Sequence, residues 1–99
     1  MDLQEVAAGL AERVNGKPPL VGSIKFDLGE AGTLFIDGNG NGNEVTAHRN
    51  DTARCTITMS ADDFRDLIQG RLQPATAFMT GKMRVDGDMF LAMKLGQMV

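Results

Sequence analysis

The sequence predicts an α+β fold in which a five-stranded sheet is covered on one face by helices. Five segments alternate apolar and polar side chains with a period of two, as strands with one buried face do. Four other segments carry apolar residues at helical spacing or begin and end with capping residues. With 99 residues, 42% of them hydrophobic, the chain should form one domain over residues 1–99 around a single core.

The N-terminal half is predicted to form one helix and three strands. The helix begins after Asp2, which offers a capping box with Glu5, and ends at the sequence NGKPP. Its apolar side consists of Leu3, Val6, Ala7, Leu10 and Val14. Strands follow in LVGSIKFDL (20–28), TLFID (33–37) and EVTAHR (44–49).

The sequence DGNGNGNE, residues 37–44, resembles the start of a calcium-binding EF-hand loop and also a phosphate-binding loop. The twelfth residue of an EF-hand loop starting at Asp37 should be a bidentate Glu, but it is His48. A phosphate loop should lead into a helix, and Asp37 and Glu44 would repel an anion. Asn-Gly pairs between two strands favour a hairpin, because both residues tolerate positive φ. We therefore expect a turn here and no metal site.

The C-terminal half begins with a strand in RCTITMS (54–60) and a helix. Ser60 is a good N-cap for that helix and Gly70 ends it. Its apolar stripe consists of Phe64, Leu67 and Ile68.

Two more helices flank the fifth strand. Pro74 suits the first position of a short helix, PATAFMT (74–80). The strand KMRVDG (82–87) follows, and Asp88 can cap a last helix in MFLAMKLGQMV (89–99). The apolar residues on overlapping faces of that helix are Met89, Phe90, Met93 and either Leu95 or Val99. The separation of the fourth and fifth strands suits a helical crossover rather than a hairpin.

Composition argues against several functional classes. No window approaches about 18 consecutive apolar residues, so we expect no membrane span. A net charge of -3 with five Phe, no Trp and no Tyr argues against nucleic acid as a partner. The N-terminus does not resemble a signal peptide, and the single Cys55 suits a reducing compartment. We therefore expect a cytoplasmic location.

The sequence assembles no nucleophile, base and oxyanion donor, so we expect no enzyme, no cofactor and no metal. His48, the only histidine, lies on the polar face of a predicted strand, and Cys55 lies on a buried face. The acids that start the third-quarter helix are explained by its dipole: Asp62, Asp63 and Asp66. Five of the seven methionines fall between Met79 and Met98. Flexible thioethers suit binding of variable ligands, although ordinary core packing explains the same pattern.

The region from Met59 to Leu95 resembles the sterol carrier protein type 2 domain family. The family typically shows Gly-x-Leu-x-Pro, then Ala-Phe/Tyr-x-x-Gly-Lys, a short strand, Gly-Asp and Leu-Ala-x-x-Leu. The matching residues are Gly70, Leu72 and Pro74; Ala77, Phe78, Gly81 and Lys82; Gly87 and Asp88; and Leu91, Ala92 and Leu95. The N-terminal half is similar only in the order of its elements. Because the peroxisomal tripeptide of animal members is absent, the chain resembles a free-standing bacterial member.

The resemblance implies a mainly antiparallel five-stranded sheet covered by helices, with an apolar tunnel between the layers. It implies non-catalytic binding and intracellular transfer of fatty acids, fatty acyl-CoA, phospholipid or sterol-like molecules. The residues expected to form the lipid-binding wall are Ile24, Phe26, Ile36, Ile57, Phe64, Leu67, Ile68, Phe78, Met79, Met83, Val85, Met89, Phe90 and Met93. Candidates for contact with a lipid head group are Arg71, Lys82 and Arg84.

The chain reaches Val99 soon after the last motif, where many relatives continue. We therefore expect one end of the tunnel to be open or closed by another subunit. Transient contact with a membrane surface is compatible with this reading, and no protein partner is identified. The alternative function is a protein-interaction or lipid-presenting accessory module of a lipid or quinone pathway, which would use the same apolar groove.

Overall fold

A computed structural model describes residues 2–98 and has the predicted α+β architecture. The elements along the chain are α1 (Leu3–Val14), β1 (Ser23–Asp27), the short 3-10 helix η1 (Gly29–Ala31), β2 (Thr33–Asp37), β3 (Glu44–Ala47), β4 (Cys55–Thr58), α2 (Ala61–Ile68), α3 (Pro74–Met79), β5 (Arg84–Gly87) and α4 (Met89–Met98). The predicted strands and helices are all present. Val99, a candidate for the apolar face of α4, lies outside the described residues.

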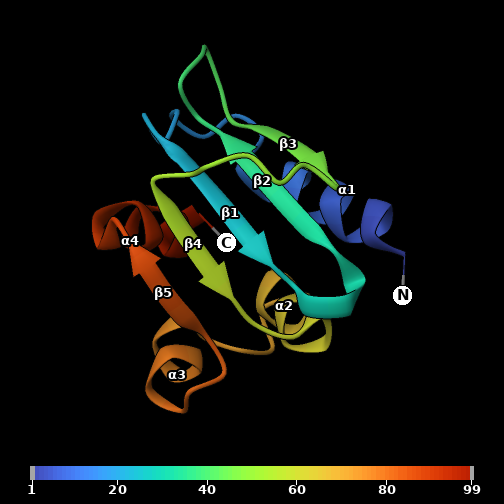
Figure 1. The fold of residues 1–99 in the computed structure, drawn as a ribbon. Coiled ribbons are helices and arrows are strands. Elements are labelled where there is room, and N and C mark those ends of the chain that lie inside the picture. The colour runs from blue at the N-terminus through green and yellow to red at the C-terminus, as the bar shows by residue number, and fades with distance from the viewer. Residues whose placement is uncertain (1, 99) are drawn as a thin grey trace.

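The five strands form one sheet in the order β3-β2-β1-β4-β5. β1 and β4 run parallel, and the other three neighbouring pairs are antiparallel. The sheet is therefore mainly antiparallel, as predicted. In Figure 1, α1, α2 and α4 lie behind the sheet and α3 lies beside the start of β5.

The core lies between the sheet and the helices. Phe26 of β1 and Phe64 of α2 are both fully buried, and their rings contact each other with centroids 4.7 Å apart and planes tilted by 52°. The apolar stripe of α1 is buried as well. Burial of each large side chain stabilises the fold by about 1.5–3 kcal/mol, which explains why period-two and helical patterns select these elements.

The predicted hairpin and helix caps are present. β2 and β3 pair antiparallel, so residues 37–44 form a turn between strands. Within the turn, Asp37 accepts a hydrogen bond from the Asn39 backbone N–H at 3.0 Å. Ser60 Oγ accepts one from the Asp63 N–H at 3.1 Å at the start of α2. No helix among residues 2–98 is long and apolar enough to cross a membrane.

The second face of the sheet is partly covered, which alternation alone did not predict. Because β3 lies at one edge and β4 lies beyond β1, residues 48–54, here called the strap, cross in front of β2 and β1 (Figure 1). The Arg49 guanidinium lies 4.2 Å from the centre of the Phe35 ring. The backbone N–H of Arg54 donates to Ser23 Oγ at 3.2 Å. Phe35 and Ser23 are therefore buried on the face where the pattern placed exposed side chains.

Candidate functional site

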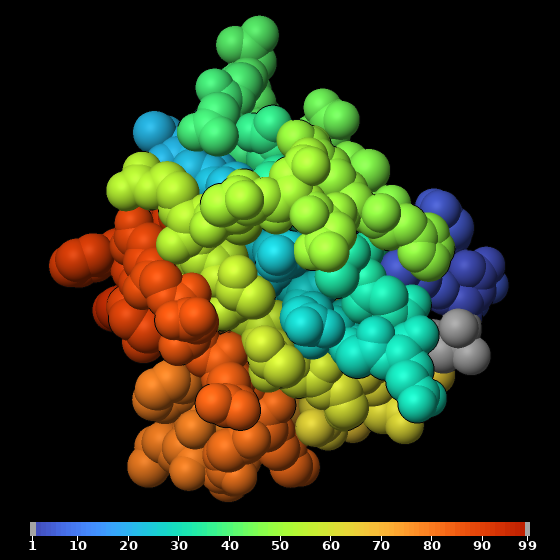
Figure 2. Space-filling model, viewed as in Figure 1, coloured from blue at the N-terminus to red at the C-terminus, as the bar shows by residue number. Residues whose placement is uncertain are grey.

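An apolar groove lies between α3 and α4, at the β5 edge of the sheet. These two helices are the orange and red regions that meet at one side of Figure 2. The groove has a volume of about 440 Å³, which falls within the roughly 300–1,000 Å³ of small-molecule sites. Its lining residues are Gln73, Pro74, Ala75, Phe78, Met83, Val85, Met89, Ala92, Met93, Gly96 and Gln97.

A tight turn after α3 brings the first side of the groove together. Ala77 is fully buried, and its carbonyl accepts hydrogen bonds from the N–H groups of Lys82 at 2.9 Å and Met83 at 3.1 Å. Gly81, at φ +78, allows the chain to reverse. The reversal places Met83 in the floor of the groove and leaves Phe78 of α3 in its wall.

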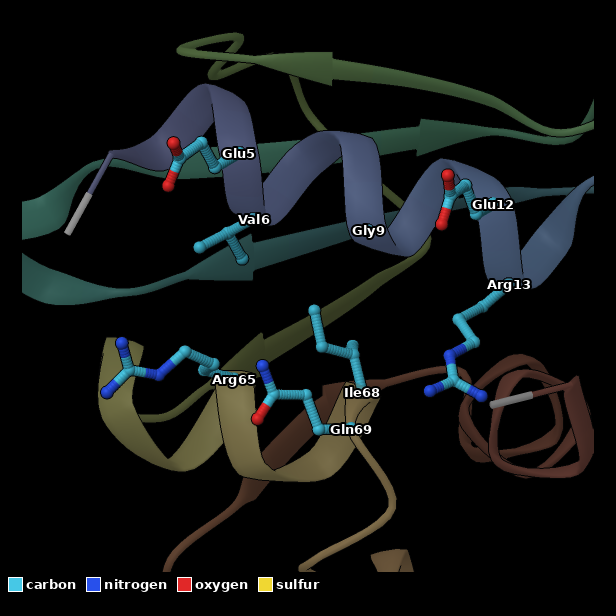
Figure 3. A pocket seen from close by; sticks show the side chains of 8 residues that line it. All are labelled: Glu5, Val6, Gly9, Glu12, Arg13, Arg65, Ile68 and Gln69. Atoms are coloured by element: carbon cyan, nitrogen blue, oxygen red, sulfur yellow. The ribbon is translucent and has the colours of Figure 1, made fainter.

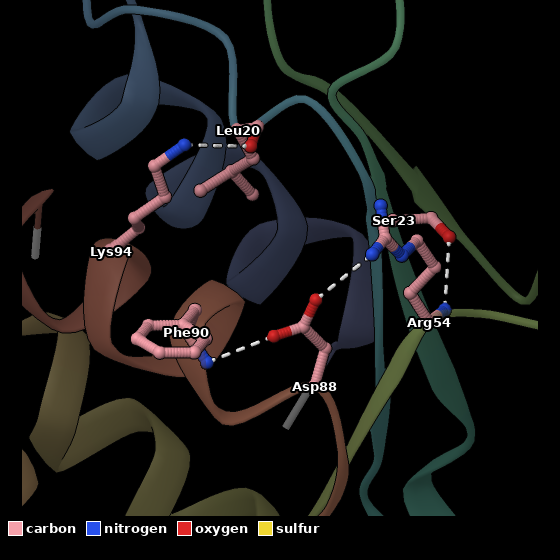
Figure 4. A network of polar contacts seen from close by, with 6 residues as sticks. All are labelled: Leu20, Ser23, Arg54, Asp88, Phe90 and Lys94. Carbon is pink, nitrogen blue, oxygen red and sulfur yellow. Dashed lines mark hydrogen bonds and ion pairs between the residues drawn. The ribbon is translucent and has the colours of Figure 1, made fainter.

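Polar contacts hold α4, which forms the other side (Figure 4). Asp88 accepts a hydrogen bond from the Phe90 N–H at 3.0 Å, so it caps the helix as predicted. Its second carboxylate oxygen lies 3.2 Å from Nη2 of Arg54, the last residue of the strap. Further along the helix, Lys94 Nζ donates to the Leu20 carbonyl at 3.1 Å. The position of α4 is thus fixed by segments from the N-terminal and middle parts of the chain.

Large apolar side chains are exposed around the groove. Phe78 is 50% exposed, Met89 44% and Met93 60%. Met79 and Phe90, which do not line the groove, are 84% and 78% exposed. Contiguous apolar surface of this kind usually marks a site of interaction.

The predicted wall residues divide into three groups. Those that line the groove are Phe78, Met83, Val85, Met89 and Met93. Those in the closed core are Ile24, Phe26, Ile36, Ile57, Phe64, Leu67 and Ile68. Those outside the groove lining are Met79 and Phe90 together with the head-group candidates Arg71, Lys82 and Arg84.

The prediction missed the smaller and polar lining residues Gln73, Pro74, Ala75, Ala92, Gly96 and Gln97. Helical spacing carried a usable signal for those on α4. Ala92 and Gly96 lie three and seven residues after Met89, on the same helix face. Small residues there leave room for a ligand that larger ones would fill.

A void of about 30 Å³ lies behind the groove. Pro74, Met83, Ala92 and Gly96 line both spaces. On its inner side the void is bounded by the core residues Phe26, Ile57, Leu67 and Leu95. A continuous tunnel between the layers stays a prediction.

A second hollow, of about 310 Å³, lies between α1 and α2 (Figure 3). Its lining residues are Glu5, Val6, Gly9, Glu12, Arg13, Arg65, Ile68 and Gln69. An acyl chain placed there would take several charged groups out of water without giving them partners, which is costly. This hollow is therefore a poor site for an apolar ligand.

The described residues offer little for acid–base or nucleophilic chemistry. Among residues 2–98, no three or more His, Cys, Asp or Glu side chains are grouped so that they could hold a metal ion. Burial, and secondarily the charges of Asp88 and Asp86, raise the pKa of the Cys55 thiol. The buried thiol is therefore protonated at neutral pH and is a poor nucleophile. The arrangement around the groove suits binding of apolar surface.

Known proteins resemble the chain in both sequence and fold. The SCP-2 sterol transfer family matches residues 3–99. Hydroxysteroid dehydrogenase-like protein 2 from Bos taurus is 37% identical over 78 residues, which cover 76% of this chain and 19% of that protein. Sterol carrier protein 2 from Gallus gallus is 37% identical over 96 residues, covering 94% of this chain and 17% of that protein. The chain thus spans about a fifth of the length of these curated relatives.

A solved structure shares the fold over nearly the whole chain. It is the solution structure of Sterol Carrier Protein-2 from Aedes aegypti in complex with the C16 fatty acid palmitate. The TM-score is 0.76 and the identity 25%, with coverage of 98% of this chain and 93% of that chain.

Proposed function

The chain belongs to the SCP-2 sterol transfer family, and we propose that it binds a lipid with a long acyl chain in the groove between α3 and α4. Its role is non-catalytic transfer of that lipid within the cytoplasm. The observation that carries the proposal is the concentration of exposed Phe and Met side chains around a 440 Å³ apolar groove. The palmitate held by the Aedes aegypti relative supports a fatty acyl chain as the ligand class.

The magnitude of apolar transfer determines how completely the ligand must be covered. A sixteen-carbon chain has about 15 methylenes, each worth roughly 0.8 kcal/mol on leaving water, or about 12 kcal/mol in total. Immobilising the ligand costs about 4 kcal/mol or more. The remaining 8 kcal/mol or so corresponds to a dissociation constant of about micromolar. If only half of the chain left water, the balance would be about 2 kcal/mol, too weak for a carrier.

Micromolar binding therefore requires the groove to close around the chain. Phe78, Met89 and Met93 are each about half exposed, so they still have apolar surface to bury against a ligand. Unbranched methionines can repack around chains of different shape at low cost. This property supports broad tolerance among fatty acids, fatty acyl-CoA, phospholipids and sterol-like molecules.

The polar end of the ligand is expected near the groove mouth. Gln73 and Gln97 are the polar side chains in the lining and can offer hydrogen bonds. Arg71, Lys82 and Arg84 lie outside the lining, so their contact with a head group stays a prediction.

Fluorescent palmitate titrated into delipidated protein tests the proposal. We expect saturable binding near micromolar that unlabelled palmitate displaces, and a co-purified lipid mass in native mass spectrometry of protein taken from cells. Folded protein that takes up no amphiphile would refute the proposal. A lipid-free chain recovered with a protein partner would instead favour the accessory-module function.

A further inference from the structure

We propose that the face around the groove mouth docks on an anionic lipid bilayer, with the apolar rim entering the membrane interface. The apolar rim consists of Phe78, Met79, Met89, Phe90 and Met93. The proposal rests on the proposed function, because it treats the groove as the lipid site. It adds the surface from which the groove is loaded and onto which it is emptied.

The first observation is that a bound acyl chain cannot cover the whole rim. Met79 and Phe90 are the two most exposed large apolar side chains of the rim, and neither lines the groove. They lie at the end of α3 and the start of α4, on the two helices that form the groove. Exposed Phe and Met beside a lipid site are the residue types that enter the boundary between head groups and acyl chains.

The second observation is the distribution of charge along the chain. Residues 70–99 carry four Lys or Arg and two Asp, whereas residues 1–69 carry six Lys or Arg and eleven Asp or Glu. The segment that forms the groove is thus net positive, although the whole chain has a charge of -3. An anionic surface attracts this segment and repels the rest, which orients the molecule.

Two cations are available for lipid phosphates. Lys82 and Arg84 are exposed and form no ion pair within residues 2–98. They alternate along the chain with Met83 and Val85, which line the groove. Asp88, by contrast, is already paired with a cation of the strap.

A bilayer fits this face better than α1 or a second copy of the chain does. The apolar side of α1 is buried in the core and its outer side carries Glu5 and Glu12, so α1 cannot serve. A second copy placed face to face would oppose two sets of unpaired cations and leave two hollow grooves against each other. Acyl chains of a membrane can fill the groove, so cargo passes without crossing water.

Co-sedimentation with vesicles tests the proposal, using equimolar phosphatidylcholine and phosphatidylglycerol against phosphatidylcholine alone at low ionic strength. We expect the wild-type chain to sediment with the anionic vesicles. Met79→Ser/Phe90→Ser should lose about tenfold or more of this binding. Lys82→Gln/Arg84→Gln should lose at least about fivefold per charge. Arg13→Gln/Lys17→Gln is the matched control, since it removes the same charge from exposed positions on the α1 side and should bind at least as well as wild type.

Each outcome separates this proposal from the carrier function. Uptake of fluorescent palmitate without any sedimentation would overturn the membrane face and leave the carrier function intact. Equal losses in both charge variants would overturn it too, as would a wild-type dimer that Met79→Ser/Phe90→Ser converts to a monomer. Vesicle binding with no palmitate uptake would support the face and refute the carrier. If the apolar double variant does not fold, Met79→Ser and Phe90→Ser are compared singly.

Discussion

Met93→Asp is the substitution that tests the groove most directly. Met93 lines the groove on α4 and is 60% exposed in the ligand-free chain. A carboxylate at this position stays hydrated without ligand, so the variant should fold with a loss of about 0.5 kcal/mol from lower helix propensity. The larger penalty should appear only when an acyl chain displaces water from the groove.

That penalty has two parts. Burying the exposed part of a Met side chain against a ligand is worth about 1–2 kcal/mol, which the variant loses. Removing water from a polar group without giving it a partner costs about 1–3 kcal/mol in proteins. The combined loss of about 3 kcal/mol corresponds to roughly 100-fold weaker binding of palmitate.

The assay is displacement of a fluorescent fatty acid in the absence of vesicles, with circular dichroism to confirm folding. Met79→Asp is the matched control, because Met79 undergoes the same chemical change at an exposed position outside the groove lining. We expect the control to bind within about threefold of wild type, less than 1 kcal/mol. A folded Met93→Asp chain with wild-type affinity, or equal losses in both variants, would show that the groove is not the site.

Three further predictions concern the framework. Gly87 has φ +106, and a Cβ there would lie 2.4 Å from the Arg54 carbonyl oxygen. Gly87→Ala should therefore destabilise the fold by about 3 kcal/mol and lower Tm by about 12 °C or more, whereas Gly40→Ala, which meets no atom within 4 Å, should shift Tm little. Ser60→Ala removes the N-cap of α2 and should cost about 1 kcal/mol in urea unfolding, while an unchanged midpoint would contradict that role. The raised pKa of Cys55 means that its contribution to stability is complete below the ordinary thiol pKa of about 8.5 and falls as pH rises above it, a slope that Cys55→Ala should abolish.

The sequence was sufficient to predict every strand and helix because each has one buried face with a clear period. Leu34 and Ile36 alternate with polar neighbours, and the residues that cap the helices stand where the structure places them, at Asp2, Ser60 and Asp88. These are local preferences, which act between neighbours in the chain. The hairpin at residues 37–44 was predictable for the same reason.

Long-range arrangement was not predictable in this way. Nothing in the pattern of Cys55 and Ile57 specifies that β4 pairs with β1 in parallel. The strap follows from that pairing, and only the strap explains why Phe35 is buried beneath Arg49. For the site, the apolar residues of β1, β4 and α2 are indistinguishable in sequence from groove residues, because core packing and ligand binding both select large apolar side chains.

The partition between the groove and the void behind it has a consequence for the range of cargo sizes. Pro74, Met83, Ala92 and Gly96 separate the two spaces, and Met83 is the only long, flexible side chain among them. Rotation of one thioether would therefore lengthen the usable space toward the interior without moving the backbone. Selectivity for acyl length should then be a gradual slope, with each added carbon changing affinity by a small step, instead of a sharp cut-off.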